Sequence, residues 1–267
     1  MELTPPQDAN NHPITTRRLA APAVLRYDSL KRGGEKPTSM GKYDEYKRDV
    51  LAVSQALSEQ GYFGTKSGSA GNVSALIEGE EVVAVTPSGK NYSDMRAEDI
   101  CIVDFGLGRI DATCDASIEA PMHVAVYKNR RDVNAVIHTH QAYASVFSVL
   151  NQPIPPLFDE VTASVGALID VVPYGLSGSP ELLENVVSKL GNRGHCYLLQ
   201  NHGALCVGRN LEKTVSYVEL LEKAACIYYH ALATGKSITT LPEPLVTTLS
   251  QFVLSLQDME IARKDNL

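Results

Sequence analysis

Apolar positions along the chain fall into two kinds of segment, one with the period of an α-helix and one with the short continuous runs of buried strands. Between residues 42 and 60, apolar side chains recur at helical spacing, and Gly61 then ends the segment. The same spacing predicts helices over residues 121–127, 143–150, 180–190 and 211–234. Continuous apolar runs predict strands over residues 81–86, 100–105, 133–140, 195–199 and 204–207. Strands that alternate with helices in this way indicate an α/β or α+β domain.

Two stretches show no such pattern. Residues 1–40 are rich in Pro, Asn, Thr, Arg and Gly and have no sustained period, which predicts an extended N-terminal arm. Residues 41–267 are expected to form one domain. Within that domain, residues 157–172 leave the choice between helix and strand open.

Composition and charge narrow the class of protein. The chain has 267 residues, of which 44% are hydrophobic, enough for a domain with a sizeable core. Its formal net charge of -7, without a local basic patch, argues against a nucleic-acid or anionic-membrane partner. No apolar run reaches the roughly 18 residues of a membrane helix, and the N-terminus lacks the layout of a secretory signal, so a cytoplasmic protein is expected. The five scattered cysteines are interpreted as free thiols.

His138 and His140 stand one residue apart at the end of the apolar run over residues 133–140. Because strand side chains alternate between faces, both imidazoles point to the same side and can meet one ion. A catalytic metal site of the zinc type takes three protein ligands and leaves one position open. His202 is the candidate for the third ligand, because it lies where another apolar strand breaks into a turn. The alternative interpretation is that these histidines are polar residues at the rim of a sheet.

Glu119 precedes a helix that carries Pro121 in its first turn, so its carboxylate can project into the same pocket as the histidines. An acid there could ligate the metal or move a proton. The alternative is a favourable charge at a helix N-terminus, worth a few tenths to about 1 kcal/mol. His123, four residues later on the same helical face, is interpreted as a packing or supporting residue.

Two loops of small residues, 68–74 and 86–89, could bind an anion. Their N–H groups and hydroxyls could hold a phosphate or a carboxylate. The same composition is typical of ordinary turns, so neither loop by itself predicts a ligand.

Five motifs nevertheless occur together, and in chain order they are Gly71-Asn72-Val73-Ser74, Thr86-Pro87-Ser88-Gly89, Ser117-Ile118-Glu119, His138-Thr139-His140 and Gln200-Asn201-His202-Gly203. The set closely resembles the class II aldolase and adducin family, over about residues 42–236. Within that family, the enzyme branch that the chain resembles most is the L-fuculose-phosphate aldolase group.

The resemblance implies a three-layer α/β/α fold with a central, mainly antiparallel sheet, and a homotetramer with active sites between neighbouring subunits. It implies that His138, His140 and His202 hold zinc, with manganese or cobalt as alternatives, and that Glu119 is the catalytic acid and base. The substrate would be a small sugar phosphate such as L-fuculose 1-phosphate, cleaved through a metal-stabilised enediolate. The substrate phosphate would lie among Gly71, Asn72, Ser88, Gly89 and Ser117.

Two positions depart from the family pattern. Ile118 stands where the aldolases often carry a second serine, and Asp159 appears where the fuculose-phosphate enzyme has a tyrosine that reaches into a neighbouring site. A metal-dependent decarboxylase of the same fold, acting on a carboxylated substrate, is therefore the alternative enzyme. A non-catalytic, adducin-like assembly module is the third possibility, although such modules lose the metal histidines that this chain retains.

Overall fold

One mixed sheet organises the computed structural model, which describes residues 41–65 and 68–266. Eight strands stand in the order β4-β3-β2-β1-β5-β8-β7-β6, and of the neighbouring pairs only β6 and β7 run parallel. The strands are β1 (Asn72–Leu76), β2 (Val82–Val85), β3 (Cys101–Asp104), β4 (Arg109–Asp111), β5 (Ala135–Thr139), β6 (Asp170–Val172), β7 (Cys196–Leu199) and β8 (Gly203–Gly208). The mainly antiparallel sheet implied by the family resemblance is thus confirmed.

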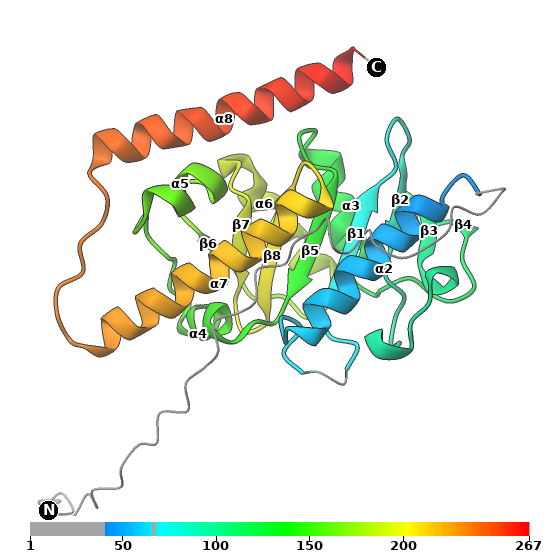
Figure 1. The fold of residues 1–267 in the computed structure, drawn as a ribbon, viewed down its shortest axis with the longest axis horizontal. Coiled ribbons are helices and arrows are strands. Elements are labelled where there is room, and N and C mark those ends of the chain that lie inside the picture. Colours follow the sequence, from blue (N-terminus) through cyan, green and yellow to red (C-terminus); the bar gives the residue numbers. More distant parts are fainter. Residues whose placement is uncertain (1–40, 66–67, 267) are drawn as a thin grey trace, which may run out of the picture.

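Helices cover both faces of this sheet (Figure 1). The α-helices are α2 (Asp44–Glu59), α3 (Ala120–Asn129), α4 (Ala142–Leu150), α5 (Asp159–Val165), α6 (Pro180–Lys189), α7 (Leu211–Ala233) and α8 (Glu243–Asp265). Short 3₁₀ turns occupy Tyr92–Asp94, Ala97–Asp99 and Leu190–Asn192. Helices α2 and α7 lie on one face, and α3 and α6 lie on the other.

The core is divided between the two faces because strand side chains alternate. Ile137 on β5 packs with the α2 and α7 side, whereas its neighbour Val136 packs with the α3 and α6 side. Val50 of α2 and Val218 of α7 pack in the first layer of the core, and Val126 of α3 packs in the second. The three-layer α/β/α architecture is therefore confirmed.

Several elements were not predicted from the sequence. Strand β1 follows a Gly-rich loop and carries small polar residues, yet it pairs on both sides, with β2 and β5. Helix α5 and strand β6 fall in the segment left undecided, and α8 lies beyond the family resemblance. The remaining predicted helices and strands agree with the structure to within a few residues. The predicted N-terminal arm lies outside the described residues.

The strand register brings three distant chain segments to one end of the sheet. His138 on β5 pairs with Asn72 on β1 and with Leu205 on β8. Gly203 at the start of β8 lies against β5 so closely that an added Cβ would be 2.3 Å from the carbonyl oxygen of Thr139. Glycine is therefore required there, and the residue before it is brought beside the end of β5.

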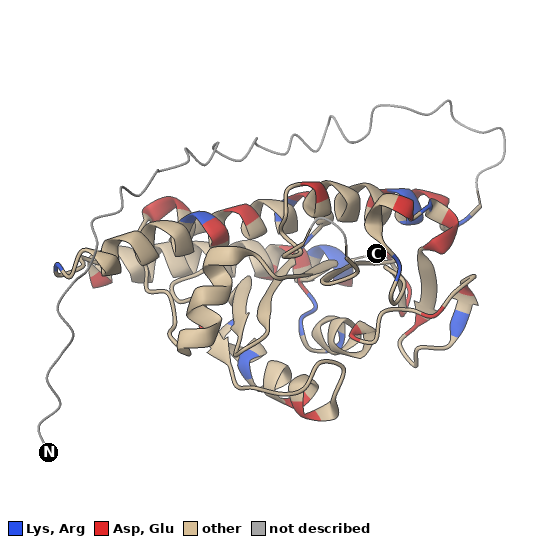
Figure 2. Cartoon of the chain, turned by 90° about the horizontal axis from the view of Figure 1, so that it is seen from below, with Lys and Arg blue, Asp and Glu red and all other residues tan. Residues whose placement is uncertain are grey.

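The helices carry charged side chains of both signs along their lengths. Figure 2 shows Lys and Arg interspersed with Asp and Glu along the helices in that view. Within residues 41–65 and 68–266, no helix combines the length and apolar character needed to cross a membrane.

Candidate active site

Three imidazoles converge where β5 ends and β8 begins. The ring centroids of His138, His140 and His202 lie 4.6–5.2 Å apart in pairs. One nitrogen of each ring can be chosen so that all three atoms lie within 4.8 Å of one another. The structure thus brings together the three histidines that the sequence singled out, and their donor set could hold a metal ion.

The hydrogen bonds of the three rings are compatible with metal ligation. His138 Nδ1 donates to the carbonyl oxygen of Ala204 over 2.9 Å, because a carbonyl can only accept. This leaves His138 Nε2 on the side of the other two rings, and the Nε2 of His140 lies 2.8 Å from it. His202 Nδ1 is buried without any hydrogen-bond partner. Three imidazole nitrogens that can come within 4.8 Å of one another, with an unpartnered buried nitrogen among the rings, fit a bound metal.

The protonation state of the histidines suits a metal ligand. Burial lowers the pKa of His140 to about 3, and the neighbouring charges of His138 and His202 lower it further. Burial likewise lowers the pKa of His202 to about 4. Both rings are consequently neutral at pH 7, which is the form that binds metal.

Glu119 lies directly before α3 and points its carboxylate at the histidines. Its Oε2 is 3.4 Å from His138 Nε2, and its Oε1 is 3.4 Å from His202 Nε2. Burial alone would raise the pKa of Glu119, but the charges of both histidines and two hydrogen bonds lower it to about 2. The carboxylate is thus held in its ionised form.

Two side chains from separate segments position that carboxylate. Asn72 Nδ2 donates to Glu119 Oε2 over 2.7 Å, and the hydroxyl of Ser177 donates to Oε1 over 2.8 Å. The family resemblance places Asn72 in a phosphate pocket, whereas here its amide is engaged with Glu119. Ser177 was not predicted from the sequence, because it lies in a loop between β6 and α6 and belongs to no motif.

His123 is fully buried within a chain of hydroxyl groups. Its Nδ1 lies 2.7 Å from the Ser74 hydroxyl, which in turn lies 2.7 Å from the Tyr127 hydroxyl. Burial lowers the pKa of His123 to about 3. It therefore stands as a neutral residue behind Glu119, in agreement with the supporting role expected from the sequence.

The two predicted anion loops lie next to Glu119. The Ser88 N–H donates to the carbonyl of Asp115 over 2.9 Å, and the Ser117 N–H donates to the carbonyl of Thr86 over 3.0 Å. Loop 86–89 thus runs beside the segment that leads to Glu119, with Ser88 and Gly89 exposed. Gly71 is buried with a φ of +72°, and an added Cβ would be 2.8 Å from the carbonyl of His138.

Apolar side chains that are half or more exposed border the site. Ile118 precedes Glu119, Leu176 precedes Ser177, and Val149 follows Ser148. Ser148 itself accepts the His202 N–H through its hydroxyl oxygen at 3.3 Å, so Val149 lies near the loop that carries His202. We call the exposed residues Ile118, Val149, Leu150, Tyr174 and Leu176 the apolar rim.

Asp159 is not part of the apolar rim. It is exposed at the first position of α5, where its Oδ1 accepts the N–H of Glu160. Helix α5 packs against α7 and α8. Asp159 therefore belongs to a different surface of the same chain.

Comparison with known proteins places this geometry in a family. The family model described as Class II Aldolase and Adducin N-terminal domain matches residues 48–229. The L-fuculose phosphate aldolase of Escherichia coli K12 is 33% identical over 190 residues, covering 71% of this chain and 86% of that relative. A 5-methylthioribulose-1-phosphate/5-deoxyribulose-1-phosphate aldolase of Escherichia coli O45:K1 is 35% identical over 184 residues, covering 69% and 84%.

Solved structures agree with the sequence relatives. A solved L-fuculose 1-phosphate aldolase superposes with a TM-score of 0.71 at 28% identity, covering 78% of this chain and 95% of that one. YgbL of Klebsiella pneumoniae, described as a putative aldolase/epimerase/decarboxylase, superposes with a TM-score of 0.68 at 24% identity, covering 79% of this chain and all of the other. The similarity to YgbL shows the fold alone.

Proposed function

The chain belongs to the class II aldolase and adducin family, and from that premise we propose that it is a metal-dependent aldehyde-lyase that cleaves a small sugar phosphate. The family assignment made from the five sequence motifs is confirmed. The relatives reported above at 33% and 35% identity are named aldolases, and aldolases are lyases. The observation that carries the proposal is the convergence of three imidazoles on a carboxylate that two further side chains hold in place.

The metal is proposed to be zinc, with manganese or cobalt as alternatives, bound by His138, His140 and His202. Three imidazoles with an open position form the ligand set of many catalytic zinc sites. When bound, the cation would polarise the substrate carbonyl and stabilise negative charge that develops on its oxygen as the carbon–carbon bond breaks.

Glu119 is proposed to move the proton. Its Oε2 is held by the buried amide of Asn72, whereas Oε1 is held by a serine hydroxyl that can rotate about its own bond. Oε1 is therefore the atom proposed to take the proton from a substrate hydroxyl and to return it to carbon. Burial of the carboxylate excludes bulk water from that transfer.

The phosphate is proposed to bind in the two loops beside Glu119. The support is their proximity, since loop 86–89 is hydrogen-bonded to the segment that carries Ser117, and Ser88 and Gly89 are exposed. Gly71, Asn72, Ser88, Gly89 and Ser117 remain the proposed group. Asn72 would then contribute through the second N–H of its Nδ2, because the other N–H donates to Glu119.

The reaction is tested by incubating the protein with candidate ketose 1-phosphates, including L-fuculose 1-phosphate and 5-deoxyribulose 1-phosphate. Retro-aldol cleavage yields dihydroxyacetone phosphate and one aldehyde in equal amounts, and both can be measured. Carbon dioxide from a carboxylated substrate, without any aldehyde, would instead identify the decarboxylase. The named relatives do not favour that alternative.

The metal is tested by elemental analysis of the purified protein. His138→Ala should remove both the metal and the activity, because it removes one of three ligands. The surface variant His230→Ala is the matched control, because His230 is an exposed histidine on α7. A wild-type protein that contains no stoichiometric metal after growth with zinc would favour the assembly module and contradict the enzyme.

A homotetramer with active sites between neighbouring subunits is proposed as well. The support is the apolar rim, since exposed apolar residues that cluster together are typical of a protein interface. Val149→Asp should lower the mass measured by light scattering and reduce the activity. The cytoplasmic location and the absence of a nucleic-acid partner remain predictions from the sequence.

A further inference from the structure

Helix α8 attaches to the molecule at the end of β5 opposite to the candidate site. Lys264 donates to the carbonyl of Val133, and Glu260 accepts from Asn134, both directly before β5 begins. The histidines lie where β5 ends. Figure 1 shows α8 along one edge of the molecule, beside α5. Any role of α8 is therefore separate from the proposed chemistry.

Only part of the apolar surface of α8 is buried. Val246, Val253 and Gln257 face the body of the protein, and Gln257 Nε2 donates to the carbonyl of Arg193 over 2.9 Å. Beside this docked face runs a second row of apolar side chains, which we call the α8 stripe. It consists of Leu245, Leu249, Phe252, Leu256 and Met259.

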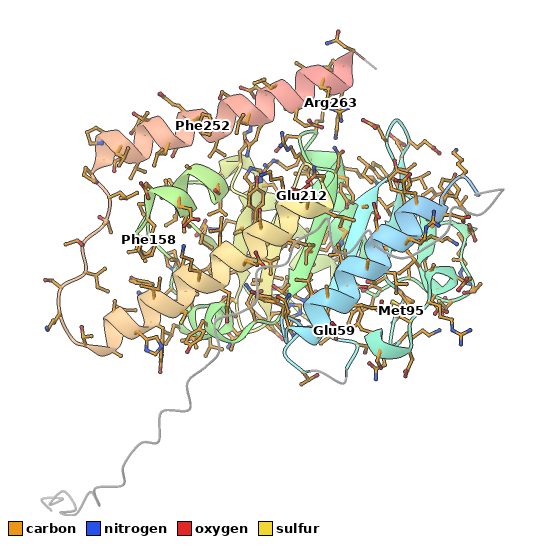
Figure 3. All side chains as sticks on the ribbon, in the orientation of Figure 1. Glu59, Met95, Phe158, Glu212, Phe252 and Arg263 are labelled. Atoms are coloured by element: carbon orange, nitrogen blue, oxygen red, sulfur yellow. The ribbon has the colours of Figure 1, made fainter. Side chains whose placement is uncertain are left out.

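Four of the five stripe side chains are exposed, Leu249 is half-buried, and the row has the spacing of a helix-pairing seam. Phe252 is 52% exposed and Met259 67%, while Leu245 and Leu256 are 38% and 44% exposed. Successive members are four, three, four and three residues apart, which is the spacing of the a and d positions of a coiled coil. Figure 3 labels Phe252 near the middle of α8 and Arg263 near its C-terminal end.

The stripe is complementary to itself when two helices run antiparallel. Leu245 lies seven residues before Phe252, and Met259 lies seven residues after it. With a twofold axis at Phe252, each Leu245 meets the Met259 of the other copy, and each Leu249 lies near the other Leu256. Self-complementarity of this kind is what a twofold interface requires.

The helix dipoles favour the same arrangement. In an antiparallel pair the two dipoles oppose each other, which is the favourable orientation for neighbouring helices. The charged side chains near the C-terminal end of α8 have partners within the chain, since Arg263 pairs with Glu78 and Glu260, and Asp265 pairs with Arg131.

A hollow lies beside the stripe. It is a pocket of about 290 Å³ between α7 and α8, and Phe252 and Leu256 line it on the α8 side. Most of its other lining residues are polar, among them Lys213 of α7, so the apolar contact area of the stripe lies outside this pocket. We propose that α8 pairs antiparallel with α8 of a second copy of this chain, through the α8 stripe and about an axis at Phe252.

Cysteine cross-linking in the full-length protein tests this pairing. Phe252→Cys places two thiols at the axis, so a short bismaleimide should link two chains in high yield. Gln251→Cys is the matched control, because Gln251 is an exposed neighbour whose side chain points about 100° away from the stripe. Wild-type protein gives the background from native cysteines, of which Cys114 and Cys226 are partly exposed. A yield for Phe252→Cys no higher than for Gln251→Cys overturns the proposal.

The relative orientation of the two helices and the mass of the assembly provide two further tests of the pairing. A mixture of Leu245→Cys and Met259→Cys chains should link to each other more than either chain links to itself, whereas a parallel pair would give the reverse and overturn the proposal. Light scattering provides the second test, since Phe252→Asp should halve the mass of the assembly that the wild-type chain forms at equal concentration. Met259→Asp, at the most exposed position of the stripe, should do the same if Phe252→Asp misfolds. An unchanged mass in the folded variants overturns the proposal, whatever the activity of the protein is.

Discussion

At the scale of single residues, the side chains around Glu119 decide which form of the carboxylate is present. Burial works against its charge, but two hydrogen bonds and two nearby imidazoles outweigh burial and lower its pKa to about 2. An ionised carboxylate beside the candidate ligands is the arrangement that a metal-dependent proton transfer needs. This balance supports the division of roles proposed between Glu119 and the histidines.

Glu119→Gln should separate metal binding from proton transfer. The amide keeps the size of the side chain but cannot take up a proton, so kcat should fall roughly 10²–10⁴-fold. Metal content should stay at the wild-type level, because the three imidazoles are untouched. Steady-state kinetics and elemental analysis of the same preparation give both values. A variant with full activity would show that another group moves the proton.

Ser177→Ala should reveal a positioning role. Loss of a hydrogen bond to a buried carboxylate corresponds to about 1.5–3 kcal/mol, so kcat should fall by about tenfold or more while KM changes little. Ser177→Thr keeps a hydroxyl and should restore much of the activity, which a merely structural role would not predict. Equal kcat values for the alanine variant and the wild type would contradict this role.

His138 and His140 could be found from the sequence because alternation along a strand fixes the face on which they lie. His202 could be found only with the additional observation that an apolar strand breaks at that position. Ser177 could not be found, because a lone serine in a loop carries no periodic or compositional signal. Its contact with Glu119 joins segments that are 58 residues apart.

At the scale of elements, the pairing of β5 with β8 determines where His202 lies. Gly203 begins β8 directly against Thr139, and the Cα of Leu205 is opposite that of His138. The close approach of two backbones holds the turn that carries His202 beside the end of β5. Pairing of strands, rather than the loop itself, therefore assembles the ligand set.

Gly203→Ala should disturb that assembly. The new methyl group would lie 2.3 Å from the carbonyl oxygen of Thr139, which forces the two strands apart. Overpacking of this kind costs about 1–3 kcal/mol and should also weaken metal binding by moving His202. Gly191→Ala is the matched control, because an added Cβ there meets nothing within 4 Å. Thermal unfolding and metal titration of both variants provide the comparison.

The elements with strong local patterns were predictable, and those without such patterns were not. Helices α2 and α7 have apolar residues at helical spacing that face the sheet, so sequence and packing agree. Strand β1 carries Asn72 and Ser74, two small polar residues that sequence rules do not assign to a central strand. Both are buried through partners supplied by other elements, namely Glu119 for Asn72 and His123 for Ser74.

At the scale of the whole molecule, buried neutral histidines link stability to pH. Burial lowers the pKa of His195 to about 4 and that of His123 to about 3, from an ordinary value near 6.5. His195 donates from Nδ1 to the carbonyl of Val207, and its Nε2 accepts from Gln257 of α8. Below pH 6.5 the unfolded chain binds protons that the folded chain excludes.

The free energy of unfolding should therefore be fully retained above about pH 6.5 and decrease as the pH falls from 6.5 toward 4. Unfolding by urea at several pH values, with a chelator present so that metal binding does not contribute, measures this slope. His195→Gln keeps a donor and an acceptor but cannot take up a proton, so its slope should be shallower. Equal slopes in the variant and the wild type would exclude His195 as a source of the acid sensitivity.

The sequence by itself determined the family, the α/β character of the chain and three histidines able to bind metal, because each rests on residue types at fixed spacing. Only the tertiary structure decided which side chains hold Glu119, where β1 lies, and that α8 leaves an apolar stripe exposed beside its docked face. These features depend on contacts between segments far apart in the chain. Such contacts are fixed by strand register and helix packing, which local spacing does not specify.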